Sequence, residues 1–155
     1  MNGVLTSVIA VVGTLSGASL TFQFARLTAR RTEQVARAER LRQERITAYT
    51  DFAGAMTELR QALIALWFLQ HKDPPDPGTW AAHTEADRLG AAADHARFKV
   101  RLLTGDRELL DLADAAFEPI GDLTGTADRA ALRECEDRSQ EILTRFIATA
   151  SRQIR

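Results

Sequence analysis

The stretch that decides the fold lies at residues 4–25 and has the sequence VLTSVIAVVGTLSGASLTFQFA. It contains no charged residue, and as a helix of 22 residues it would reach roughly 33 Å, enough to cross a hydrocarbon core of about 30 Å. Two alternatives stay open, a buried core helix and a signal peptide. A signal peptide normally starts with basic residues, whereas only Met1, Asn2 and Gly3 precede this run. We therefore expect a transmembrane anchor over residues 1–25.

Arginine is concentrated directly after the anchor. Residues 26–45 contain seven arginines and three glutamates, whereas no basic side chain precedes the anchor. The positive-inside rule then predicts a single-pass protein of the plasma membrane, with its N-terminus outside and its C-terminal domain in the cytoplasm. We expect Arg26, Arg30 and Arg31 to lie at the membrane surface, where arginines can bind the anionic headgroups of the lipid bilayer.

Small residues recur at helical spacing along one face of the anchor, and two of its glycines form a GxxxG motif. Small side chains let two helices approach closely, and this packing drives helix association in lipid. The pattern predicts a homo-oligomer formed through Thr6, Ala10, Gly13, Gly17 and Thr21. The alternative is that glycine is simply common in membrane helices.

The totals indicate one domain behind the anchor. Of 155 residues, about 130 follow the anchor, which is enough for a single hydrophobic core. The net charge of −1 argues against nucleic acid as a partner, and the basic segment at 26–45 also lacks interleaved aromatic residues. Cys135 is the only cysteine, so no internal disulfide can form, as expected in a reducing cytoplasm.

The spacing of apolar residues predicts four helices in an antiparallel bundle over residues 46–155. The first continues the anchor through a basic helical stalk at 26–45, carries a heptad seam from Tyr49 to Leu66, and ends at the sequence HKDPPDPG at 71–78. The fold class is therefore all-α, with an N-terminal transmembrane helix that continues into a four-helix bundle.

Turn residues predict the ends of the other three helices. Thr79 is expected to cap a helix over residues 80–103, and Asp106 to cap one that reaches Pro119 or Gly121. The last helix is expected over residues 127–153, after a loop at 121–126. Its inward side chains should be Leu132, Cys135, Ser139, Ile142, Phe146 and Ile147.

No pattern of catalytic or cofactor-binding residues emerges. His83 and Asp87 share a helix face and could hold a metal ion, but His95 lies too far along the helix to join them and no thiolate cluster completes a site. Cys135 falls on an apolar seam, which is typical of a core residue rather than of a reactive thiol. We expect no enzyme activity, no cofactor and no metal.

Aromatic residues flank the proline-rich loop at 71–78. Trp67, Phe68 and Trp80 could form a tip that binds an unidentified protein partner, since exposed aromatic side chains often anchor interfaces. Alternatively, these side chains close the end of the bundle core.

Two stretches resemble a known family. They are VIAVVGTLSGASLTFQF at 8–24 and RAERLRQERITAYTDFAGAMTELRQALIALWF at 37–68, and over residues 8–69 the chain is similar to the small KilB-type membrane proteins of actinomycetes. The resemblance implies a membrane-associated role in the spread of plasmid DNA between mycelial compartments. It implies no catalytic residue.

Two functions fit these observations. The first is a membrane-anchored interaction or scaffold protein without catalysis, an accessory of plasmid or mobile-element spread. The second is a soluble helical binding module whose N-terminal apolar helix packs into an oligomer or a partner. Membrane residence of the intact chain would distinguish them.

Overall fold

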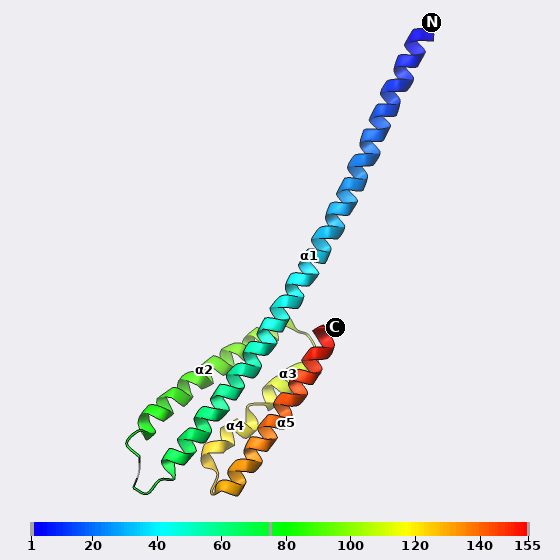
Figure 1. Cartoon of the computed structure of the whole chain (residues 1–155). Coiled ribbons are helices and arrows are strands. Elements are labelled where there is room, and N and C mark those ends of the chain that lie inside the picture. The colour runs from blue at the N-terminus through cyan, green and yellow to red at the C-terminus, as the bar shows by residue number, and fades with distance from the viewer. Residues whose placement is uncertain (1, 75, 155) are drawn as a thin grey trace. The chain divides into compact units, whose positions relative to one another are not determined.

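In the computed structural model the chain forms helices α1 (Asn2–Gln70), α2 (Thr79–Leu103), α3 (Arg107–Ala115), α4 (Glu118–Asp122), η1 (Leu123–Gly125) and α5 (Arg129–Ile154) (Figure 1). The structure describes residues 32–74 and 76–154 with their side chains. No strand occurs in these residues, and the predicted all-α class is confirmed. The chain divides into two compact units, residues 1–41 and residues 42–155, and the second unit is a helical bundle.

The predicted anchor at 4–25 lies outside the residues whose side chains are described. Across 32–74 and 76–154, none of the helices contains an apolar stretch long enough to cross a membrane.

The turn before α2 is stabilised by Asp76, and not by the side chain of Thr79 as predicted. Asp76 accepts a hydrogen bond from the amide of Gly78 at 2.8 Å, and its backbone carbonyl accepts one from the hydroxyl of Thr79 at 2.7 Å. Thr79 is therefore the first residue of the helix, and the prediction that its side chain is the N-cap is wrong. The Asp76 carboxylate instead orders the turn that leads into α2.

The third predicted helix is interrupted. Asp106 caps α3 as expected, since its carboxylate accepts the amide of Leu109 at 2.9 Å. However, α3 ends at Ala115, and Pro119 lies within the first turn of the separate helix α4, where its missing N–H costs nothing. The segment predicted as a loop at 121–126 is largely helical, because α4 runs to Asp122 and η1 follows directly.

The core of the bundle is centred on aromatic side chains from α1 and α5. The ring of Phe146 lies 4.8 Å from that of Phe52 and 6.0 Å from that of Tyr49, measured between centroids. One inward position of α5 was predicted wrongly: Ile147 is 48% exposed. The buried positions of α5 are Leu132, Cys135, Ser139, Leu143, Phe146, Thr149 and Ala150.

Arginines assigned to the stalk close one end of the bundle. Arg42 donates from Nε to the carbonyl of Ile154, and Arg45 donates from Nε to the carbonyl of Leu103, both at 2.8 Å. These carbonyls lie at the C-terminal ends of α5 and α2, where the helix leaves them without intrahelical partners. The second unit accordingly begins at Arg42, inside the segment that the sequence suggested was a solvated stalk.

Candidate interaction surface

Helix α2 carries apolar side chains on two opposite faces. Its inner face packs into the core through Ala86, Leu89, Ala93, Ala96 and Val100. On the other side, Trp80, Phe98 and Leu102 are 80%, 53% and 84% exposed. A surface helix normally has one apolar face and one polar face, so the second apolar face is unusual.

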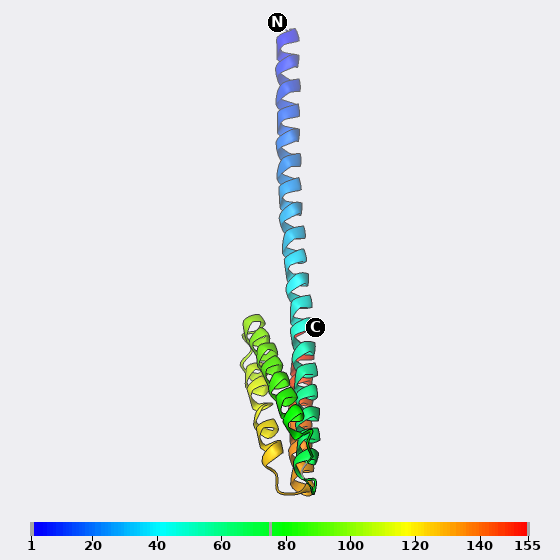
Figure 2. The same cartoon turned by 90° about the vertical axis from the view of Figure 1, so that its left-hand side faces the viewer.

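The exposed apolar residues belong to one straight stripe, which we call the outer face of α2. With about 100° of rotation per residue, its seven members fall within an arc of about 80° that is centred opposite the buried residues. All seven are exposed, and in Figure 2 α2 runs along the side nearest the viewer. The members are Trp80, Thr84, Asp87, Ala91, His95, Phe98 and Leu102.

Two polar groups stand near the middle of the outer face. Asp87 lies four residues before Ala91, and His95 lies four residues after it. No group of three or more His, Cys, Asp or Glu side chains that could hold a metal ion occurs in the part of the chain that is described. The middle of the outer face thus carries one acidic group and one imidazole.

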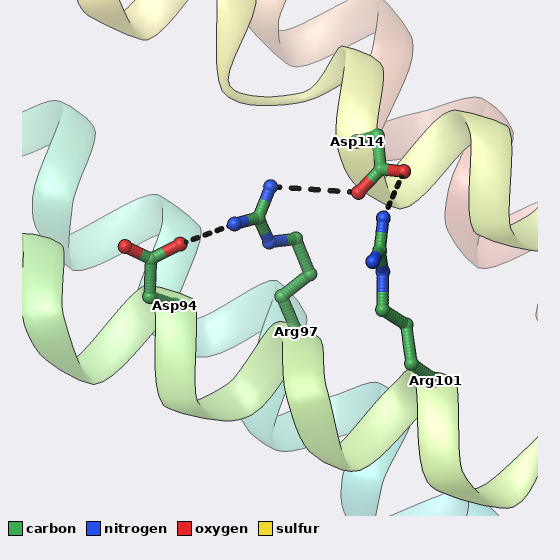
Figure 3. A network of polar contacts seen from close by, with 4 residues as sticks. All are labelled: Asp94, Arg97, Arg101 and Asp114. Carbon is green, nitrogen blue, oxygen red and sulfur yellow. Dashed lines mark hydrogen bonds and ion pairs between the residues drawn. The ribbon is translucent and has the colours of Figure 1, made fainter.

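Ion pairs hold α2 against its neighbours. Arg97 bridges Asp94 on its own helix and Asp114 on α3, at 2.7 Å and 3.4 Å, and Arg101 also binds Asp114, at 2.6 Å (Figure 3). The guanidinium of Arg97 also lies 4.5 Å from the ring centroid of Phe117. On the other flank of α2, Lys99 pairs with Asp51 of α1 at 3.5 Å. The outer face is thus presented by a helix that is fixed on both sides.

The aromatic tip predicted around the proline-rich loop is divided by the structure. Trp67 is buried, donates from Nε1 to the carbonyl of Thr126 at 3.0 Å, and stacks on His71 with centroids 4.0 Å apart. It therefore closes the end of the core, which was the alternative interpretation. Phe68 is 40% exposed and lies under the guanidinium of Arg129, while Trp80 belongs to the outer face of α2.

Phe98 and Leu102 are interface candidates that the sequence analysis did not identify. The available signal was the helical spacing of Ala91, Phe98 and Leu102, which places them on the side of α2 opposite its alanine-rich stripe. His83 and Asp87, considered above as metal ligands, both line a groove between α2 and α4.

Grooves are also present on the surface of the bundle, and two of them border α1. One has a volume of about 320 Å³ and lies between α2 and α4, with a floor formed by Leu59, Leu63 and Leu66 of α1. The other has a volume of about 210 Å³ and lies between α1 and α5, where Ile147 forms part of its wall. Buried Cys135 lines neither groove, as expected for a core residue.

The remaining predicted site residues fall outside the described side chains. They are the oligomerisation stripe and the membrane-surface arginines, namely Thr6, Ala10, Gly13, Gly17, Thr21, Arg26, Arg30 and Arg31.

The chain was compared with known protein families. Residues 46–154 match the family model described as KilB plasmid transfer protein. The match covers the helical bundle, whereas the resemblance noted in the sequence extended over the anchor and the first helix. Searches of curated proteins and of solved structures found no match.

Proposed function

The chain belongs to the KilB plasmid transfer protein family, and from this premise we propose that it serves plasmid transfer as a helical interaction protein without catalysis of its own. In this proposal the bundle binds another protein through the outer face of α2. Residues 4–25 tether the chain to the membrane, and the bundle lies in the cytoplasm.

One observation carries the proposed interaction. Trp80, Phe98 and Leu102 are the most exposed large apolar side chains of the bundle, and all three lie on one face of one helix. Leaving such side chains in water has a free-energy cost of about 1.5–3 kcal/mol each relative to full burial. Large exposed apolar side chains on one helix face are typical of protein interaction sites, in which aromatic side chains contribute most of the binding energy.

The membrane part of the proposal is supported by the uncharged segment at 4–25 and by the arginines that follow it. Arg26, Arg30 and Arg31 would bind anionic headgroups. Carbonate extraction tests the tether. The intact chain should stay in the membrane fraction, and a chain that lacks residues 4–25 should be extracted. Extraction of the intact chain by carbonate would instead favour a soluble binding module.

Plasmid transfer from a donor in which this chain is the only member of its family tests the interaction. We expect the double variant Phe98→Ser with Leu102→Ser to lose transfer while its circular dichroism spectrum and thermal melt stay unchanged, because both side chains point away from the core. Ile147→Ser is the matched control, since it removes an exposed apolar side chain from α5. Normal transfer by the double variant would overturn the proposal.

A further inference from the structure

Resting on the proposed function, we propose that the partner of the outer face of α2 is the same face of a second copy of this chain, in an antiparallel pair centred on Ala91. The self-complementary order of side chains along this face leads to this assignment.

The spacing of the outer face is symmetric. From Trp80 to Leu102 its members follow one another at steps of 4, 3, 4, 4, 3 and 4 residues, a series that is the same in both directions. A two-fold axis at Ala91 therefore places each member of one helix opposite a member of the other. A contact of this kind is isologous, with one surface patch used by both subunits.

The chemistry of the opposed residues is also complementary. In this register Trp80 faces Leu102 and Thr84 faces Phe98, so large side chains at the two ends meet apolar or small partners. Asp87 faces His95, whose ring N–H can donate to the carboxylate, and symmetry makes this contact twice. A parallel pair would instead set Asp87 against Asp87, which like charge disfavours.

The middle of the face permits close approach. Ala91 lies at the two-fold axis, and a methyl group there allows interaxial distances at the short end of the usual range of about 8–10 Å. The two members of each opposed pair lie on opposite sides of the centre line of the stripe, as side chains must do to interdigitate between two helices. The exposed Trp80, Phe98 and Leu102 of both copies would all become buried.

The charged residues beside the stripe leave this pairing unhindered. Arg101 is bound to Asp114 and Lys99 to Asp51, while Arg88 binds Glu85 at 2.6 Å on the same helix. Each cation next to the outer face is thus neutralised within its own copy. The polar groups that give the pairing its specificity are Asp87 and His95, which the two-fold axis places opposite each other.

Disulfide cross-linking of the full-length chain tests the register. With Cys135→Ala as background, purified Ala91→Cys protein in mild detergent is oxidised with copper phenanthroline, and Ala92→Cys is the matched control. Ala91→Cys should form a cross-linked dimer about tenfold faster, because a disulfide needs Cα atoms within about 7 Å and Ala92 is turned by about 100° from the axis. Equal rates for both variants would overturn the pairing.

A charge exchange tests the complementarity independently. Asp87→Lys should weaken dimer association about tenfold, since two symmetry-related contacts are lost at once. The double variant Asp87→Lys with His95→Asp should restore association, because the contact is re-formed with reversed polarity. Asp111→Lys, a charge reversal at an exposed aspartate of α3, should leave association unchanged. No recovery in the double variant would contradict the antiparallel register.

The failure of this inference is distinguishable from failure of the proposed function. If Ala91→Cys does not cross-link but the Phe98→Ser and Leu102→Ser variant still loses transfer, the outer face of α2 binds a different protein and self-pairing is refuted. If that variant transfers normally, the proposed function itself is refuted, whatever the cross-linking shows.

Discussion

The rings of Phe52 and Phe146 lie 4.8 Å apart between centroids at an interplanar angle of 57°, and neither side chain has any exposed surface. This contact joins α1 to α5 across the bundle, so residues far apart in the sequence share one aromatic cluster with Tyr49. Tilted aromatic pairs contribute about 0.5–1.5 kcal/mol beyond the burial of their area.

Replacing Phe146 therefore tests the core. Phe146→Ala should lower the free energy of unfolding by about 3–5 kcal/mol, through lost burial and the cavity that remains. Ile147→Ala, at the next position and 48% exposed, should cost less than about 1 kcal/mol. Urea denaturation followed by circular dichroism measures both, and equal losses would contradict the side-chain placement in α5.

Truncation tests where the bundle begins. A fragment of residues 42–155 should unfold cooperatively on heating, because the second unit starts at Arg42. A fragment of residues 46–155 lacks Arg42 and Arg45 and should be less stable by about 1–3 kcal/mol, since the end carbonyls of α5 and α2 lose their charged donors. Identical melts of the two fragments would show that these hydrogen bonds contribute nothing.

The indole of Trp67 should stabilise the opposite end of the bundle. Trp67→Phe removes the donor to the carbonyl of Thr126 and should cost about 1–3 kcal/mol, because that carbonyl is left without this partner. Trp80→Phe is the control: that indole is 80% exposed, so the thermal midpoint should not change. A loss of stability in the control instead would place Trp80 in the fold rather than in an interface.

The pH dependence of the loop before α2 follows from Asp76. The hydrogen bond from Lys72 at 2.7 Å, together with the one from the Gly78 amide, holds the pKa of Asp76 below its ordinary value of 3.8. The carboxylate therefore stabilises the loop above pH 3.8, and this contribution is lost as the pH falls through the lower folded-state pKa.

The chemical shift of the Gly78 amide should report this titration. In the intact chain its midpoint should lie below 3.8, and Lys72→Met should move it upward because the largest cause of the lowered pKa is removed. A midpoint unaffected by Lys72→Met would show that the ion pair does not form in solution.

Much of the bundle follows from short-range signals in the sequence. The prolines at 71–78 end α1, Asp106 caps α3, and the heptad seam of α1 lies in the core at Phe52 and Met56. These features depend on residues within a few positions of each other, since a proline removes a donor and a carboxylate bonds an amide three residues on. The resemblance to the KilB family was noted from the anchor and the first helix. The match of the family model to residues 46–154 confirms it.

Only the tertiary structure decided which faces are covered. The apolar periodicity of α5 does not distinguish Ile147 from Leu143, because both continue a helical spacing, yet in the packed bundle the second is buried and the first is 48% exposed. Likewise α2 has two apolar faces, and the packing of α1 and α3 on one of them leaves Phe98 and Leu102 in solvent. Helical spacing determines which residues share a face, whereas the number and direction of neighbouring helices determine whether that face meets the core or a partner.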